Sequence, residues 1–456
     1  MMEIQDSGKF SFKHLMKKSI DQLKQAKFTG KEKARHIVII AVEGLLRGDF
    51  QNIIKFPIFQ KLKIEGAYSD QLTSIYPTMT YPVLTSLVTG VYPNQHGIIH
   101  NQPFQPGISD GQKIWYNYCS EMKRKAIYDF MQERHFKTAA LNWPVTGNSV
   151  ITYNIPEITA LKSENHHLKL LRAGSPIFLL SQELRYIPVD KKIPEYMQDS
   201  FYSQIACRTL QRKKPHLLLL RLNALRKLQK KYGVCYGDQQ KYVLQKYNDL
   251  LEKMIDITKQ AKIFSDTVFI FVSVNSQIDI HTHVYLNNIL EREDLIANRG
   301  TYIDYQACFQ STGNGAYLYV KNNHLATEKH VREILEELKE AGIYGIKEIH
   351  TRNDLKKIHA DVGIAMAVEG KSGFRFMDGF HAEDIVYLDA PDATSGYNPR
   401  ASTYQNILFM YGNSIIPDTD LQAVELVDLV PTVSYLLDMD VWGGDGRILH
   451  EAIKKS

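Results

Sequence analysis

Cysteines are few in this sequence, and no pattern would pair them. Four occur in 456 residues, far apart and without a CxxC pair: Cys119, Cys207, Cys235 and Cys308. This spacing excludes a disulfide framework or a zinc knuckle and favours reduced thiols. It therefore predicts a cytoplasmic protein.

Long hydrophobic runs and a strong charge of one sign are also missing. No run of about 18 apolar residues occurs, so no transmembrane segment is expected. The first residues lack the apolar centre of a secretory signal. The net charge of +5 is small for this length, which argues weakly for an anionic ligand and against nucleic acid.

Residues 1–34 are predicted to form a helical extension that precedes a main domain at 35–456. A basic amphipathic helix of this kind could lie on a membrane surface. Packing on the domain with its lysines in water is the favoured alternative. The lysines that alternate with apolar residues at roughly helical spacing are Lys13, Lys17, Lys18 and Lys24.

Three apolar runs, the first and the last of them rich in β-branched residues, predict strands that are buried on both faces. Helical patterns at 123–133 and 238–262 separate them, and a last helix is expected around 424–437. This alternation predicts an α/β fold with a mostly parallel central sheet and helices on both faces, where ligands bind at the carboxyl ends of the strands. The runs occupy residues 36–42, 216–222 and 267–274.

The pattern changes between about residues 277 and 389. Strand-like stretches flank a predicted helix over 327–342 in this region. These features predict a smaller α/β insertion, called the cap below, before the chain returns to the main sheet.

The segment YPTMTYPVLTSLVTGVYPNQHGI at 76–98 places Thr80 in a proline-flanked turn before an apolar helix. Amides at a helix N-terminus stabilise an anion, so a hydroxyl held there can act as a nucleophile. The segment resembles the nucleophile motif of the type I phosphodiesterase/nucleotide pyrophosphatase family, in the alkaline phosphatase superfamily. Further similar stretches are AALNWPVTG (139–147), YNIPEI (153–158), KKYG (230–233), VYLNNILEREDLI (284–296) and TSGYNP (394–399).

The resemblance implies an alkaline-phosphatase-like fold and a two-zinc phosphodiesterase or phosphatase. In such an enzyme the threonine attacks phosphorus, and the metals lower its pKa and stabilise the leaving group. About seven positions must then supply carboxylates and imidazoles. The resemblance also places Trp143 and residues 154–157 near the mouth of the pocket.

Most of those ligand positions carry other residues here. Glu43 stands before Gly44 where the family has Asp, and Thr80 is retained. An arginine or lysine only donates hydrogen bonds and repels a divalent cation. We therefore expect a vestigial nucleophile, Thr80, a vestigial ligand, Glu43, and no bound cofactor, although the family uses two zinc ions. The replaced positions are Arg226, Lys230, Val274, Asn275 and Ser395.

Arg226 and Lys230 are predicted to occupy the vacated metal site, with Glu43 as their counter-ion. Together with Asn275 they could bind a phosphate, because charge-assisted contacts to phosphate oxygens need no metal. The alternative is an ion pair that only closes the old cavity. The sequence favours neither the phosphate site nor the ion pair over the other.

Two other polar groups could supply metal ligands. Every second residue of DIHTH, that is Asp279, His281 and His283, would share one face of a strand, a geometry compatible with zinc. Solvated surface residues are the favoured interpretation of both groups. His96 is expected to be a hydrogen-bonded structural residue. The groups are Asp279, His281 and His283, and His381, Asp384, Asp389 and Asp392.

The favoured function is that of a catalytically inactive family member that binds a phosphorylated small molecule, a nucleotide or a partner protein. The first alternative is an active phosphodiester or phosphomonoester hydrolase that uses Thr80 with a rewired or single-metal site. In that case the charges of Arg226 and Lys230 could replace metal charge in the transition state. The second alternative is a scaffold for a protein partner.

Overall fold

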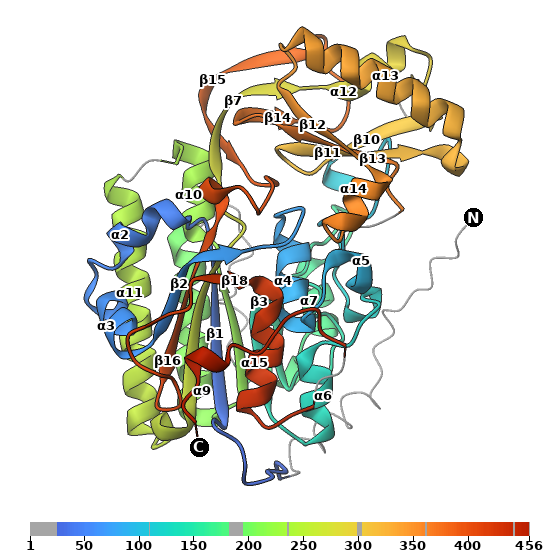
Figure 1. Ribbon diagram of the computed structural model, residues 1–456. Coiled ribbons are helices and arrows are strands. Elements are labelled where there is room, and N and C mark those ends of the chain that lie inside the picture. The colour runs from blue at the N-terminus through green and yellow to red at the C-terminus, as the bar shows by residue number, and fades with distance from the viewer. Residues whose placement is uncertain are drawn as a thin grey trace.

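A nine-stranded sheet forms the centre of the larger part of the molecule (Figure 1). The computed structural model describes residues 25–108, 110–181, 195–234, 237–298, 303–360, 363–440 and 443–455. The strand order is β17-β2-β16-β6-β1-β5-β3-β4, and β18 also pairs with β2. The strands are β1 (His36–Glu43), β2 (Ala67–Thr73), β3 (Thr138–Trp143), β4 (Tyr153–Pro156), β5 (Leu217–Leu222), β6 (Thr267–Val274), β16 (Asn406–Gly412), β17 (Thr419–Asp420) and β18 (Ala423–Glu425).

The sheet is mostly parallel, which confirms the predicted fold class. Strand β1 pairs in parallel with β5 and β6, and β3 pairs in parallel with β4 and β5. Among the described strands of this central sheet, only β16 runs antiparallel to its neighbours, β2 and β6. The three apolar runs of the sequence are therefore β1, β5 and β6.

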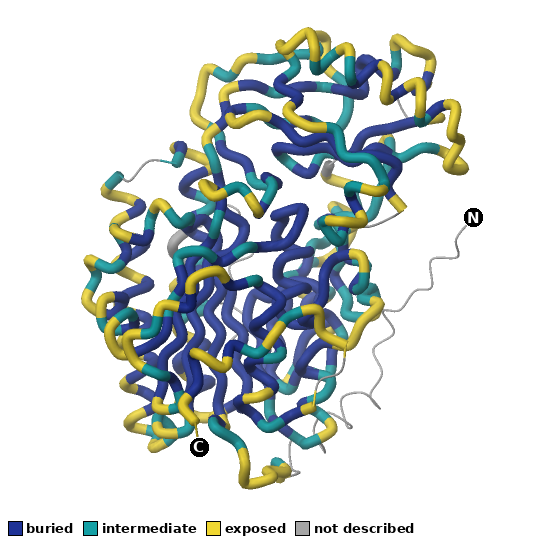
Figure 2. Tube along the Cα trace, viewed as in Figure 1, coloured by how far each residue is buried: buried dark blue, intermediate teal, exposed yellow. Residues whose placement is uncertain are grey.

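Strand β1 shows why these runs become central strands. All eight of its residues are buried. Successive side chains point to opposite faces of a strand, so the residues at 37, 39 and 41 enter one hydrophobic core and those at 38, 40 and 42 enter the other. Full burial of such a side chain stabilises by about 1.5–3 kcal/mol. Figure 2 shows the resulting dark, buried centre of the sheet.

Helices cover both faces of the sheet. The first core is closed by α4 (Thr80–Thr89), α6 (Ile127–Glu133) and α15 (Leu429–Leu436). The second core is closed by α3 (Pro57–Glu65), α9 (Glu195–Lys213), α10 (Ala224–Tyr232) and α11 (Asp238–Gln260).

Two predicted helices differ from the structure. The last helix, α15, begins five residues later than expected, because residues 423–425 pair with β2 as strand β18. Residues 25–34 of the predicted N-terminal helix are not helical. Residues 1–24 lie outside the described part of the chain.

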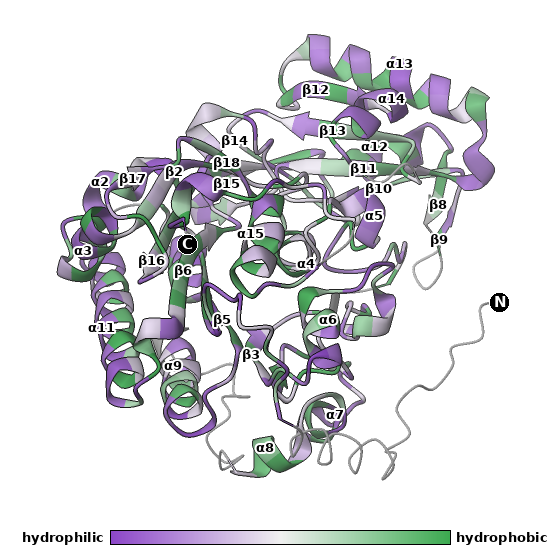
Figure 3. Ribbon diagram, turned by 60° about the horizontal axis from the view of Figure 1, so that its bottom comes forward, coloured by the Kyte–Doolittle hydropathy of each residue, from purple (hydrophilic) through white to green (hydrophobic). Residues whose placement is uncertain are grey.

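Smaller sheets lie between β6 and β16 in sequence and have a hydrophobic core of their own. They stand beyond the carboxyl ends of the central strands (Figure 1). Figure 3 shows α13 lying over them, with polar and apolar residues mixed along its length. The cap boundaries near 277 and 389 stay a prediction. The strands are β7 (Ile278–Val284), β8 (Ile296–Asn298), β9 (Ile303–Tyr305), β10 (Ala307–Ser311), β11 (Gly315–Val320), β12 (Ile346–Thr351), β13 (Met366–Gly370), β14 (Gly373–Phe376) and β15 (Ile385–Thr394), and the helices are α12 (Leu286–Arg292), α13 (Leu325–Ala341) and α14 (Arg352–Lys357).

Among the described residues, none of the helices combines the length and the apolar character needed to cross a bilayer.

Candidate functional site

The residues around Thr80 meet at the carboxyl ends of the central strands. Glu43 is the last residue of β1, Asn275 directly follows β6, and Thr80 is the first residue of α4. Gly44 lets the end of β1 approach α10 closely. Its φ is +105°, and a Cβ there would lie 3.1 Å from the backbone nitrogen of Arg226. This is the edge at which open α/β sheets bind ligands.

Helix α4 is placed by its two ends. Met79 precedes it with an extended backbone, and Pro82 in the first turn breaks no helical hydrogen bond. Gly90 ends the helix in the left-handed region with φ 70°, where an L side chain would be strained. Every residue of the helix is buried, so Thr80 is held in a rigid position.

The Thr80 hydroxyl is enclosed in a hydrogen-bonded network. It donates to Glu43 Oε2 at 3.2 Å and accepts from Asn275 Nδ2 at 2.5 Å. The same Asn275 amide lies 2.9 Å from Glu43 Oε2. Thr80 is only 4% exposed and Glu43 is fully buried. The network therefore leaves the hydroxyl without a free face toward solvent.

Two arginines neutralise Glu43. Arg221 donates through Nε to Glu43 Oε1 and through Nη1 to Glu157 Oε2. Arg226 Nε lies 2.6 Å from Glu43 Oε2. The structure thus brings Arg226 to Glu43, as the sequence predicts, and adds Arg221, which the sequence reasoning missed. Its signal was a lone charge within the apolar run of β5, LLLLRL.

These contacts decide the protonation state of Glu43. Burial alone raises the pKa of its carboxyl, but the charges of Arg221 and Arg226 and the hydrogen bonds from Arg221 and Asn275 outweigh burial and lower the pKa below its ordinary value. Glu43 is therefore a carboxylate at neutral pH. A carboxylate with a lowered pKa is a weak base, so it is poorly suited to take a proton from Thr80.

A cavity of about 350 Å³ lies between this edge of the sheet and the cap. Met79 lines it, whereas Thr80 itself does not. Ser395 also lines the cavity, while Val274 and Asn275 are buried behind it. Four cationic side chains line the cavity. Arg226 and Lys230 come from α10, Arg375 comes from β14 of the cap, and Lys113 comes from a loop.

The cations of this pocket differ in their partners. Lys113 Nζ lies 2.9 Å from Asp378, and Arg375 Nη1 lies 3.4 Å from Asp392. Lys230 forms no hydrogen bond or salt bridge within the described part of the chain. Desolvation and then the charges of Arg375 and Arg226 lower the pKa of Lys230, despite opposition from Asp392. An anion in the pocket would relieve this repulsion.

The other predicted ligand groups do not assemble around a common point. Asp279, His281 and His283 alternate on one face of β7, as predicted. Asp279 accepts from the backbone of residue 234, and His283 lies 3.6 Å from Asp392. In the second group, Asp384 pairs with Arg292 at 2.5 Å. His381 stacks on Tyr285, and Asp389 is exposed.

Two further expectations have clear outcomes. His96 is buried and hydrogen-bonded through Nε2 to Ser86 Oγ at 2.9 Å, which confirms a structural role. Burial lowers the pKa of His96 to about 3, so the ring is neutral. The placement of Trp143 at the pocket mouth is wrong, because this side chain is fully buried in the core beneath α4.

Comparison with known proteins identifies the family of this chain. The chain belongs to the type I phosphodiesterase/nucleotide pyrophosphatase family, whose model matches residues 37–406. Ectonucleotide pyrophosphatase/phosphodiesterase 1 of Saccharomyces cerevisiae is 25% identical over 264 residues, which are 52% of this chain and 32% of that protein. Human family member 1 is 46% identical over 97 residues, 19% of this chain and 10% of the relative. The chain therefore spans a minor part of these relatives.

Solved structures show the same fold. Murine ectonucleotide pyrophosphatase/phosphodiesterase 5, in an inactive variant in complex with AMP, has a TM-score of 0.64 and 15% identity. The human protein of that name has a TM-score of 0.63 and 17% identity. Each comparison covers 90% of this chain and 97% of the other. These likenesses confirm the alkaline-phosphatase-like α/β fold.

The expectation that no cofactor is bound is corrected by these findings. The family match over residues 37–406 makes metal dependence the expectation for this chain. Among the described residues, the groups that contact Thr80 or Glu43 are the amide of Asn275 and the guanidinium groups of Arg221 and Arg226, which contact both oxygens of Glu43. A second carboxylate, Glu157, is itself paired with Arg221. In this arrangement those residues do not fit a pair of zinc ions, which need several carboxylate or imidazole ligands.

Proposed function

We propose that this chain is a family member that binds a phosphorylated ligand, of the nucleotide class, without hydrolysing it at Thr80. The ligand's phosphate lies in the pocket between the sheet edge and the cap. Arg226, Lys230 and Arg375 line this pocket and supply fixed positive charge there.

The observation that carries the proposal is the paired state of Glu43. Arg221 and Arg226 contact its two oxygens, and the Thr80 hydroxyl donates to it. A hydroxyl nucleophile needs an adjacent base or a metal to become reactive. Glu43 is a weak base because its pKa is lowered. Thr80 is therefore held as a hydrogen-bonding residue and not as an attacking group.

Anion binding is supported by the charges that the pocket presents. Lys230 is exposed to the pocket and without an ion-pair partner among the described residues, and its lowered pKa reflects desolvation and repulsion from Arg375 and Arg226. Charge-assisted hydrogen bonds to phosphate are about twice as strong as neutral ones. The AMP of the murine relative's structure makes AMP a suitable probe.

Binding of AMP by isothermal titration calorimetry tests the ligand. The comparison is between Lys230→Met and Lys231→Met, which remove the same charge from adjacent residues of α10. Only Lys230 lines the pocket. We expect Lys230→Met to weaken binding by about 10-fold or more, since a hydrogen bond to a charged group contributes about 1.5–3 kcal/mol. Lys231→Met should change it less than about 2-fold.

Two outcomes would contradict the ligand assignment. An equal loss of AMP affinity in Lys230→Met and Lys231→Met would mean that AMP binding depends only on the overall charge of the protein. No AMP binding by the wild-type chain, and no shift of its melting temperature by AMP, would favour the scaffold alternative, because a bound ligand stabilises the folded state.

A cytoplasmic location is a further part of the proposal. The described, buried cysteines Cys207 and Cys308 form no disulfide, as expected in a reducing compartment. Cys235 lies outside the described residues. Fractionation of cells that produce the full chain would test this location, and recovery in the medium would contradict it.

A further inference from the structure

Three potential metal ligands gather on one face of the cap, on strands β12 and β13. Glu348 lies directly opposite Glu369 across the two strands. His350 is two residues after Glu348, so its side chain leaves the strand on the same face. Two carboxylates opposite each other destabilise a sheet unless a cation lies between them. The pairing itself thus creates a place for positive charge.

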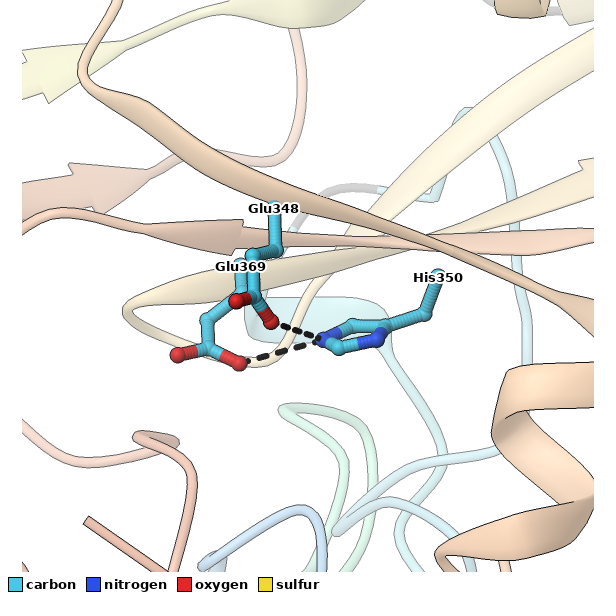
Figure 4. Close-up of side chains that lie close together, drawn as sticks. All are labelled: Glu348, His350 and Glu369. Atoms are coloured by element: carbon cyan, nitrogen blue, oxygen red, sulfur yellow. Dashed lines mark hydrogen bonds and ion pairs between the residues drawn. The ribbon is translucent and has the colours of Figure 1, made fainter.

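The ligand atoms converge on one point. His350 Nε2 lies 3.1 Å from Glu369 Oε2 and 3.7 Å from Glu348 Oε2. Figure 4 shows both carboxylates directed at the same ring nitrogen. Ligands about 2.1 Å from a tetrahedral zinc ion are about 3.4 Å apart, so the two distances bracket that spacing. Among the described residues, these three are the histidine and carboxylate side chains whose ligand atoms lie close enough to one another to share an ion.

Neighbouring groups orient the ligands and leave the common point accessible. Lys347 Nζ binds Glu369 at Oε1, 2.6 Å away, and so leaves Oε2 directed at His350. Asn398 Nδ2 donates to Oε2 at 3.2 Å. Partners of this kind fix the geometry of metal-bound carboxylates. The side chain of Glu369 is 3% exposed and that of Glu348 is 53% exposed, so an ion can enter from solvent on the Glu348 side.

A buried polar group beside the cluster has no hydrogen-bond partner among the residues that the structure describes. The Tyr76 hydroxyl is buried and unsatisfied, and the Tyr76 ring packs edge-on against His350 at 6.0 Å. A Cβ placed on Gly315, the strand partner of Glu369, would lie 3.6 Å from this hydroxyl. Burial and then the charges of Glu369 and Glu348 raise the pKa of Tyr76, so this unsatisfied hydroxyl lies close to both carboxylates of the cluster.

We propose that Glu348, His350 and Glu369 form a binding site for a divalent transition-metal ion of the zinc class. Two carboxylate oxygens and one imidazole nitrogen suit such an ion. Three protein ligands leave one position open for water or a further donor. The site lies in the cap, separate from Glu43 and Thr80, so its occupancy and the fate of Thr80 can be measured independently.

The test is a zinc titration of the full chain after metal removal with a chelator, followed by calorimetry and equilibrium dialysis. We expect His350→Gln and Glu348→Gln to bind one zinc ion fewer per chain than the wild type, or to bind it more than about 100-fold more weakly. Loss of an outer partner alone costs 10–100-fold. The difference between chains counts this site even if zinc binds elsewhere.

His330→Gln is the matched control. His330 is another cap histidine, and it lies 3.6 Å from Glu293 as part of an exposed pair. The His330→Gln variant should bind zinc with the stoichiometry and affinity of the wild type. Glu348→Gln changes an exposed side chain and should fold normally, so it decides the test if His350→Gln does not. Unchanged zinc stoichiometry and affinity in Glu348→Gln would overturn the proposal. Cobalt(II) loading gives a second readout, because the visible absorption of a tetrahedral site should be lost in the same variant.

Discussion

The guanidinium of Arg226 lies 2.6 Å from Oε2 of Glu43, at the end of the central strand β1. Where the family resemblance implies that a carboxylate faces metal ions, this carboxylate faces arginine. Breaking a buried pair by removing one partner leaves an uncompensated charge, which is costly. The stability of the fold should therefore depend on Glu43 more than on most surface acids.

Glu43→Gln is expected to lower the free energy of unfolding by about 3 kcal/mol or more, because the buried charge of Arg221 then keeps, among the described residues, only Glu157 as an ion-pair partner. Urea unfolding at pH 7 measures this. Glu333→Gln is the control, since Glu333 forms an exposed i,i+4 pair with Lys329 and should cost less than about 1 kcal/mol. Similar losses in the two variants would contradict a buried, paired Glu43.

The stability difference between the wild type and Glu43→Gln should depend on pH in one direction. The pKa of Glu43 is lowered in the folded state, so its contribution is complete above its unfolded pKa of about 4.3. It is lost as the pH falls from there through the lowered folded pKa. Unfolding at pH 7, 5, 4 and 3 should give a constant difference and then a shrinking one. A difference that grows toward low pH would contradict the sign.

Asn275 is expected to affect the free energy of unfolding in two ways, through the hydrogen bonds of its amide and through its left-handed backbone. Two variants separate these effects. Its backbone is left-handed, with φ 47°, and its amide donates to Glu43 and Thr80. Asn275→Gly removes the amide only, at a cost of about 1–3 kcal/mol. Asn275→Ala adds about 1 kcal/mol for the left-handed backbone. Urea unfolding measures both, and an alanine variant more stable than the glycine variant would contradict this account.

AMP affinity should fall as the pH rises toward the ordinary lysine range. The lowered pKa of Lys230 means that its charge is lost at a lower pH than that of a free lysine, whose pKa is about 10.4. Calorimetric titration from pH 7 to pH 10 checks this, with Lys230→Met expected to flatten the profile. A wild-type profile that is already flat, or that rises with pH, would contradict a role for Lys230.

The sequence alone predicts much of the fold, because β1, β5 and β6 are continuous apolar runs and α11 has a regular apolar stripe. The last helix is predicted too long since strand pairing of residues 423–425 with β2 is a long-range contact with no local signal. The resemblance also predicts that Glu43, Thr80 and Asn275 meet. Glu43 ends β1, Asn275 follows the neighbouring strand β6, and Thr80 begins α4 at the same edge of the sheet.

The rest of the site depends on contacts that no local pattern shows. Arg221 lies in strand β5, and it meets Glu43 and Glu157 only through tertiary contacts between segments that are distant in sequence. Arg375 reaches the pocket from the cap, whose placement over the sheet the sequence does not specify. His350 and Glu369 are distant in sequence and meet only through the register of β12 and β13.

Release of nitrophenol from a chromogenic phosphodiester, measured with zinc supplied and compared between wild type and Thr80→Ala, tests most directly whether Thr80 is held out of reaction. We expect both chains to give the same rate as buffer. Zinc-dependent turnover by the wild type that disappears in Thr80→Ala would contradict the account and favour an active hydrolase.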